Sequence, residues 1–140
     1  MEIIIGKDYP KFVIPKIDEA RHDISIIVFD WRWYENDPTN PVQLFNQAIV
    51  RAVRRGVKVS ACVNFPYSID ILSELGVDVC EYKHKGTLHS KIILIDNKDL
   101  ILGSHNFTQS AFTSNIEVSL YIKDFSGIDK IKELIENVKK

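Results

Sequence analysis

The sequence has no long hydrophobic run, few cysteines and no excess of charge of one sign. No apolar stretch approaches the roughly 18 residues that span a bilayer, and residues 1–8 carry acidic groups where a signal peptide requires positive charge. Two cysteines, Cys62 and Cys80, are too few for the disulfide framework of a small secreted domain. The 18 basic and 19 acidic residues exclude a generally basic surface for nucleic acid, although they allow a local basic patch. These absences predict a soluble, cytoplasmic protein.

The chain also lacks internal repeats, low-complexity tracts and Gly/Ser linkers, so we predict a single domain over residues 1–140. Hydrophobic periodicity and turn residues predict strands over 24–31, 57–64, 77–82 and 116–122, and helices over 9–22, 41–55, 69–75 and 128–139. Asp8 is expected to cap the first helix, and Pro15 to start or kink it. The βαβαβ succession in the middle of the chain is typical of parallel strands. We therefore predict an α/β fold with a mixed, mainly parallel β-sheet and helices on both faces.

A hairpin is predicted between residues 88 and 103. Its two apolar runs flank the turn sequence Asp96-Asn97-Lys98-Asp99. If the turn is centred between Asn97 and Lys98, opposed residues share a face of the hairpin, and Lys91 lies opposite Ser104 while His89 lies opposite Asn106. Asp96 has the opposite parity and is interpreted as a turn residue.

These four polar side chains would place an imidazole, an ammonium, a hydroxyl and a carboxamide around one point. Cationic and amide donors around a histidine suit a tetrahedral oxyanion, above all a phosphoryl group. Histidine can act as a nucleophile or a proton carrier at neutral pH. Periodicity alone is equally compatible with solvated polar residues on an edge hairpin.

The linear spacing of the same residues distinguishes these two interpretations. The pattern His89-x-Lys91-x4-Asp96-x6-Gly103-Ser104-x-Asn106 resembles, without departure in type or spacing, the HKD signature of the phospholipase D superfamily. The stretch from Gly103 to Thr108, followed by Asn115-Ile116-Glu117, is especially similar to the small bacterial endonucleases of that superfamily, which carry one HKD motif per chain.

The resemblance implies a phospholipase D-like fold and a two-step mechanism. His89 would be the nucleophile in one copy of a homodimer and the general acid and base in the other copy, with the active site at the interface. Lys91, Asn106 and Ser104 would hold the phosphate oxygens, and Glu117 would accept a hydrogen bond from the histidine. Asp96 and Gly103 complete the motif as structural residues. The resemblance implies no divalent metal and no other cofactor.

The most direct functional prediction is a metal-independent phosphodiesterase that cleaves DNA or RNA through a covalent phosphohistidine. One alternative is a phospholipase or phosphatidyl-transferase that acts on lipid head groups. A second alternative, from a different class, is a non-catalytic nucleic-acid-binding module of the same fold.

Other polar residues have competing interpretations. A zinc site built from Cys80, His84 and His89 is disfavoured, because residues four apart on a strand are about 13 Å apart. Lys83, His84 and Lys85 directly precede the catalytic strand and are candidates for substrate binding. The basic group at the end of the second predicted helix is interpreted as a solvated face rather than a phosphate contact; it comprises Arg51, Arg54, Arg55 and Lys58.

Aromatic residues and the remaining histidines complete the set of candidates. Trp31, Trp33 and Tyr34 lie at the end of a strand and in the loop after it, and could either stack on bases or bury a dimer contact, the second being slightly preferred. Trp33 is the substrate-binding candidate among them. Cys62 is expected to be a buried thiol, His105 a packing residue, and His22 a solvent-exposed residue.

Overall fold

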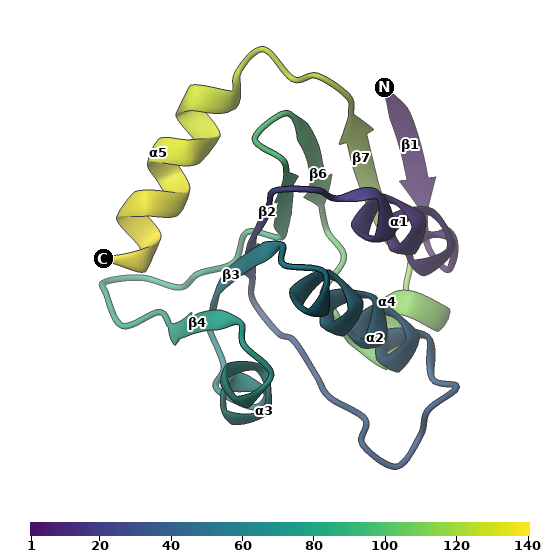
Figure 1. Cartoon of the computed structure of the whole chain (residues 1–140). Helices are drawn as coiled ribbons and strands as arrows, with labels where there is room; N and C mark the ends of the chain where they lie inside the picture. Colours follow the sequence, from purple (N-terminus) through teal and green to yellow (C-terminus); the bar gives the residue numbers. More distant parts are fainter.

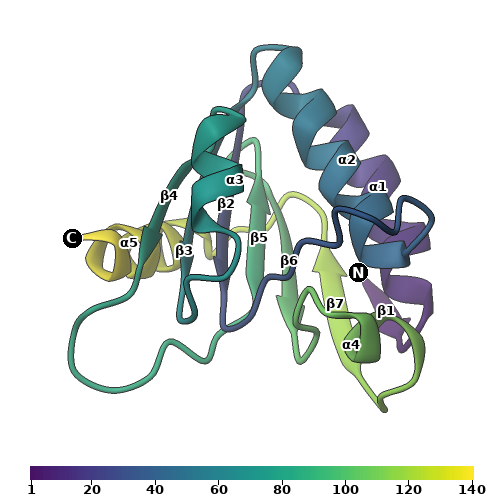
Figure 2. The same ribbon diagram turned by 90° about the horizontal axis from the view of Figure 1, so that it is seen from below.

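The computed structural model describes residues 1–140 and is built around one seven-stranded sheet. The strands are β1 (Glu2–Ile5), β2 (Asp23–Val28), β3 (Lys58–Val63), β4 (Asp78–Glu81), β5 (Ile92–Ile95), β6 (Asp99–Gly103) and β7 (Val118–Ile122). The helices are α1 (Asp8–Glu19), α2 (Pro41–Arg54), α3 (Ile69–Glu74), α4 (Gln109–Thr113) and α5 (Ile128–Lys139). Across the sheet the strands follow the order β1-β7-β6-β5-β2-β3-β4, which Figure 2 shows from one edge to the other.

The sheet is mixed, as predicted, but it is not mainly parallel. Only β2–β3 and β3–β4 are parallel, whereas β2–β5, β5–β6, β6–β7 and β1–β7 are antiparallel. The reason is that β5 returns beside β2 without a crossover helix. The strands after β5 are then joined by short connections that reverse the chain direction.

Helices cover both faces of the sheet, which confirms that part of the prediction. Helices α1 to α4 share the larger core with one face, and α1 and α2 lie side by side over it in Figure 1. Helix α5 packs alone on the other face, where its Ile135 is one of the seven buried residues of a second, smaller cluster. Ile26 and Ile27 illustrate the alternation of a strand, because the first belongs to the larger core and the second to the smaller one. None of the five helices has the length and apolar character needed to cross a membrane.

Local sequence signals explain the ends of α2 better than those of α1. The Asn40 side chain accepts a hydrogen bond from the Val42 N–H (2.9 Å), and Pro41 occupies the first turn, as expected at a helix start. Gly56 ends the helix in a left-handed conformation (φ +94°). In α1, Asp8 is the first helical residue rather than the cap, and the helix passes through Pro15 instead of starting there.

The hairpin turn differs by one residue from the expected one. Asp96 and Asn97 both adopt left-handed backbone angles (φ 54°), and the turn contains three residues, so that Ile95 pairs with Asp99. Lys91 therefore lies opposite Gly103, whose N–H donates to the Lys91 carbonyl (3.2 Å). The predicted pairing of Lys91 with Ser104, and of His89 with Asn106, is wrong.

Candidate active site

The five residues predicted to be catalytic all lie at the same end of the strands, where β5 and β7 begin and β6 ends. Strand β5 runs opposite to β2 and β6, with Ile92 between Ile27 and Leu102, so the start of β5 lies beside the ends of both neighbours. The start of β7 lies beside the end of β6, where Gly103 pairs with Ser119. His89 and Lys91 precede β5, Ser104 and Asn106 follow β6, and Glu117 precedes β7. Because these residues stand in the segments that enter and leave the strands, the altered register does not separate them.

His89 and Lys91 form the centre of the site. The Lys91 Nζ lies 3.1 Å from Nδ1 and 3.4 Å from Nε2 of the His89 ring. Phe29, which follows β2, supports both side chains: its ring centroid lies 5.0 Å from that of His89 and 5.6 Å from the Lys91 ammonium. His89 is exposed, whereas Lys91 is only 9% exposed.

Lys91 is a buried cation that forms no ion pair with a carboxylate. Burial lowers the pKa of Lys91, and the negative charge of Glu117 opposes that effect without cancelling it. A buried charge without a partner is unfavourable. An anion bound against His89 and Lys91 would therefore meet an unneutralised ammonium.

Asn106 is oriented by the backbone of the neighbouring strand. Its Oδ1 accepts a hydrogen bond from the Asp30 N–H (3.2 Å), while the Phe107 N–H donates to the Asp30 carbonyl (3.0 Å). The Asn106 amide nitrogen has no hydrogen bond to another protein group, so it is free to donate to a ligand oxygen.

Ser104 and Glu117 form a second pair. The Ser104 hydroxyl donates to the Glu117 carboxylate (2.5 Å) and accepts from the Val118 N–H (3.0 Å). The other carboxylate oxygen accepts from the Asn115 amide (3.0 Å). The expected hydrogen bond between Glu117 and His89 is not formed; the carboxylate accepts from Ser104 and Asn115 instead. Glu117 acts on the site through its charge, which raises the pKa of Lys91 against the effect of burial.

Asp96 and Gly103 have structural roles. The Asp96 carboxylate accepts hydrogen bonds from the backbone N–H groups of Arg21, His22 and Asp23 (2.7–3.2 Å) and so fixes the start of β2. Burial alone would raise the pKa of Asp96, but these three donors lower it overall. A Cβ atom at Gly103 would lie 2.4 Å from the backbone of β7, which leaves no room for a side chain.

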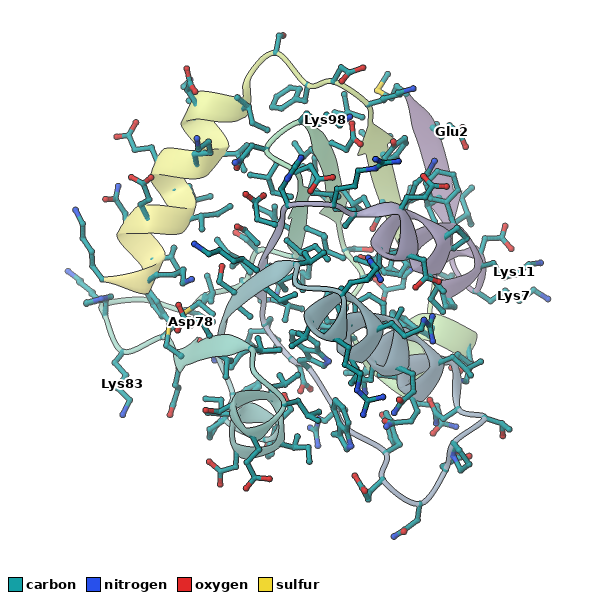
Figure 3. All side chains as sticks on the ribbon, viewed as in Figure 1. Glu2, Lys7, Lys11, Asp78, Lys83 and Lys98 are labelled. Carbon is teal, nitrogen blue, oxygen red and sulfur yellow. The ribbon has the colours of Figure 1, made fainter.

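The candidate substrate-binding loop does not contact this centre. Lys83, His84 and Lys85 lie in the exposed segment between β4 and β5, and Lys83 points outward in Figure 3. His84 contacts the carbonyl oxygen of Lys140 (2.5 Å), and the Tyr82 hydroxyl donates to the Lys85 carbonyl (2.8 Å). A role of these residues in guiding substrate stays a prediction.

The aromatic candidates after β2 have separate environments. Trp31 is fully buried and donates to Asn46 Oδ1 (2.7 Å), so the prediction that it stacks on bases or covers a dimer contact is wrong. Its ring packs against core aromatic rings. The turn residues that follow Trp31 in the sequence suggest an exposed loop instead. Trp33 and Tyr34 are half-buried; Trp33 donates to Glu35 (2.7 Å), and the Tyr34 hydroxyl accepts from the Gln109 N–H.

The basic group at the end of α2 lies away from the site. Lys58 begins β3, and so it lies at the end of the sheet opposite to the one where β2 and β3 finish. Arg51 forms two hydrogen bonds with Asp18 (both 3.0 Å), and Arg55 donates to the carbonyls of Ile17 and Ala20 at the end of α1. Arg51 and Arg55 therefore stabilise the packing of the two helices, and the absence of a phosphate contact stays a prediction.

The cysteines and the remaining histidines are also candidates. Cys62 is buried, and this burial together with Cys80 raises the pKa of its thiol to about 12. His22 is exposed and His105 is buried. Cys80, His84 and His89 do not converge, and no group of three or more His, Cys, Asp or Glu side chains is arranged to hold a metal ion.

Sequence reasoning missed two supports of the site. Asn64, which follows β3, accepts a hydrogen bond from the Leu88 N–H (3.1 Å) and positions the segment that carries His89. Asp30 orients Asn106 through its backbone. Asn64 is the first residue after β3 and Asp30 the second after β2. The two strands are parallel, and ligand sites in α/β sheets lie at the carboxyl ends of such strands. That rule, applied to β2 and β3, would have identified them.

The fold and this group of side chains form a mixed-sheet domain in which the residues of one HKD pattern gather where β5 begins and β6 ends. Residues 13–139 match the family described as "Cardiolipin synthase, PLD-like domain". The chain therefore belongs to the phospholipase D-like family.

Individual relatives agree with this membership. A phospholipase D from Rickettsia conorii is 33% identical over 120 residues, which cover 81% of this chain and 56% of that protein. The chain thus spans about half the length of the curated relatives it matches. The phospholipase D family member Nuc from Salmonella typhimurium has the same fold (TM-score 0.81, 21% identity), as does NucT from Helicobacter pylori (TM-score 0.79, 22% identity). Each alignment covers 98% of this chain and 93% of the other.

Proposed function

We propose that this chain is a metal-independent nuclease that cleaves a phosphodiester bond of DNA or RNA through a phosphohistidine on His89. The observation that carries the proposal is the buried, unpaired Lys91 ammonium against the exposed His89 ring. A phosphate at this position would supply the negative charge that the protein does not. Lys91 and the Asn106 amide would then stabilise the charge that develops on the non-bridging oxygens.

In the proposed first step, a His89 ring nitrogen attacks phosphorus, a nitrogen–phosphorus bond forms, and the bond from phosphorus to the leaving oxygen breaks. The partner subunit's His89 donates its proton to the leaving oxygen. In the second step that same ring accepts a proton from water, whose oxygen bonds phosphorus as the nitrogen–phosphorus bond breaks. Both rings return to their initial protonation states, and the cationic donors act in place of a divalent metal.

The lipid alternative is favoured by the relatives. The matching family is described as a cardiolipin synthase domain, and several matching proteins are called phospholipase D or cardiolipin synthase. Hydrolysis of a lipid head group breaks the same kind of bond, so the residues of the site do not separate these substrates. The nuclease is preferred because the stretch from Gly103 to Thr108, followed by Asn115-Ile116-Glu117, resembles the single-HKD endonucleases. The similarity in fold to Nuc and NucT, over 98% of this chain, agrees with that preference.

One substrate panel tests both candidates. Single-stranded DNA, RNA, duplex DNA and phosphatidylcholine vesicles are incubated with the protein in millimolar EDTA, with His89→Ala as the control. We expect cleavage of nucleic acid in EDTA, and a loss of several orders of magnitude in the variant because the nucleophile is gone. Turnover of the vesicles alone would establish the lipid reaction instead. Activity that is abolished by EDTA and restored only by Mg²⁺ would contradict the metal-independent mechanism.

A further inference from the structure

A row of aromatic side chains begins beside His89 and leads away from it. The Phe29 ring lies 5.0 Å from the His89 ring, Phe65 lies 4.7 Å from Phe29, and Tyr67 lies 5.7 Å from Phe65, measured between ring centroids. The row is continuous, because each ring contacts the next.

The sheet places these rings at the end of the strands where the site lies. Phe29 follows β2, and Phe65 and Tyr67 lie in the segment between β3 and α3. Pro66 separates Phe65 from Tyr67 and restricts the backbone between them. This restriction lowers the conformational entropy that the segment would lose when a ligand binds. Phe29 and Phe65 are half-buried, whereas Tyr67 is 59% exposed.

Arg32 holds the outermost ring in place. Its guanidinium lies 3.9 Å from the centroid of the Tyr67 ring, and Asp30 fixes the guanidinium through a 2.8 Å ion pair. This ion pair also raises the pKa of Arg32. Tyr67 is thus supported by a planar cation, yet more than half of its surface still faces solvent. An ordered aromatic ring that is not buried is a prepared surface for a planar ligand.

We infer that Phe29, Phe65 and Tyr67 form a stacking surface for a nucleobase beside the scissile phosphate, and that the substrate is therefore single-stranded nucleic acid. The inference rests on the proposed nuclease function. Aromatic faces stack on any base, which gives affinity without sequence selectivity. The bases of a duplex already stack on one another, so only an unpaired base can turn toward these rings.

The competing interpretation is that Tyr67 merely packs against Arg32 and stabilises the loop. A purely structural role would change the cleavage of all substrates alike. A stacking role depends on the presence of a base, so the two interpretations differ in how a Tyr67 variant responds to abasic substrates.

The experiment compares Tyr67 variants on oligonucleotides with and without the neighbouring base. Each single-stranded oligonucleotide has one cleavable phosphodiester among methylphosphonate linkages, and the base on one or the other side of it is present or removed. Tyr67→Ala is compared with Tyr67→Phe, which keeps the ring, and with Leu44→Ala, which alters an exposed apolar side chain on α2. Duplexes of the same sequence complete the set.

We expect Tyr67→Ala to lower kcat/KM about tenfold on the intact oligonucleotide, mainly through KM, because one base loses its stacking partner. On the oligonucleotide that lacks the stacked base, the variant should match the wild type. Tyr67→Phe and Leu44→Ala should behave as the wild type throughout, and duplexes should be cleaved more slowly than single strands.

The two possible failures are distinguishable. Equal effects of Tyr67→Ala on intact and abasic oligonucleotides, or equal cleavage of single strands and duplexes, would overturn the stacking surface while leaving the nuclease function in place. A wild-type protein that cleaves no nucleic acid but turns over phosphatidylcholine would overturn both.

Discussion

Lys91 is the residue at which stability and the proposed chemistry make opposite demands. Burial disfavours its ammonium form and lowers its pKa, while phosphate binding requires that form. Phe29 lies on one side of the ammonium, and Glu117 compensates only in part. The site is therefore electrostatically incomplete until an anion binds.

The alkaline limb of the pH–rate profile should report this pKa. Because the pKa of Lys91 lies below the ordinary lysine value of 10.5, rising pH removes the charge earlier than for an exposed lysine, and kcat/KM should fall there. Lys91→Met should lower kcat/KM by about two to three orders of magnitude at neutral pH, as for other donors to a developing oxyanion. Lys91→Arg keeps a permanent charge, so its residual activity should not fall over the same pH range. An identical alkaline limb in wild type and Lys91→Arg would assign that limb to another group.

At this scale the sequence predicts which residues gather but not how they orient. The HKD spacing brings His89, Lys91 and Asn106 to one place, since the motif spans two strands that must pair. It does not predict that Glu117 bonds to Ser104, nor that Trp31 turns into the core. Those orientations depend on neighbours from distant segments, such as Asn46 of α2 for the Trp31 indole.

His105 connects three elements around the site. It follows β6, its Nδ1 accepts from Ser119 of β7 (2.7 Å), and its Nε2 donates to the Gly6 carbonyl after β1 (2.9 Å). Its ring stacks on Tyr9 of α1, with the ring centroids 4.3 Å apart. Burial lowers the pKa of His105, and the Gly6 carbonyl and the Glu117 charge counter this effect only partly.

This burial predicts a loss of stability on mild acidification. The folded-state pKa of His105 lies below the ordinary value of 6.5, so its stabilising contribution is complete above that value and declines as the pH falls toward the folded pKa. The slope can reach at most about 1.4 kcal/mol per pH unit for one proton. His105→Gln retains a donor for Gly6 and should remove that slope, as measured by urea unfolding at a series of pH values. Equal slopes in both proteins would exclude His105 as the cause.

The elements that sequence reasoning missed are short and depend on tertiary contacts. Strand β1 has four residues, of which only Ile4 is buried, and its pairing with β7 joins opposite ends of the chain. Helix α4 has five residues and is capped by the Thr108 side chain. The sequence does not predict the hairpin register, because the three-residue turn has left-handed backbone angles at Asp96 and Asn97. Asp and Asn tolerate such angles, but their presence does not require them.

For the whole molecule, the sequence predicts the class of fold but not the balance of strand directions. The βαβαβ pattern correctly gives β2, β3 and β4 as parallel neighbours. The position of β5 in the sheet depends on which strand edge is left unpaired by the rest of the fold. No local sequence pattern predicts that position. The antiparallel return of β5 has the larger consequence, because it brings the HKD segment to the carboxyl ends of β2 and β3.

The structure leaves the site with one available histidine. The chain has four histidines. His22 precedes β2 at the opposite edge of the sheet, His84 contacts Lys140, and both ring nitrogens of His105 are engaged in the core. A ring that is bonded to phosphorus cannot also protonate the leaving oxygen on the opposite side of an in-line displacement. Under the proposed mechanism, we therefore expect the general acid to be the His89 of a second copy of the chain.

Exposed apolar side chains beside the site are suited to such a contact. Ile116 and Val118 flank Glu117, and both are exposed (104% and 52%). Ile5 pairs with Val118 and is 62% exposed. An apolar surface of this kind next to a polar site is typical of an interface between protein chains. A two-fold axis at this edge would bring one His89 to face the other.

Subunit mixing tests the composite site. Wild-type protein at a fixed amount is exchanged with increasing His89→Ala, and nuclease activity is measured after equilibration. If each site needs both rings, every mixed dimer is inactive, and the activity per wild-type chain should fall toward zero as mixed dimers replace wild-type dimers. Leu44→Ala, added in the same excess, should not lower it, because the added chains carry His89. Independent sites would keep each wild-type chain fully active at any excess of His89→Ala, and sedimentation of a fully active monomer at assay concentration would equally contradict the shared site.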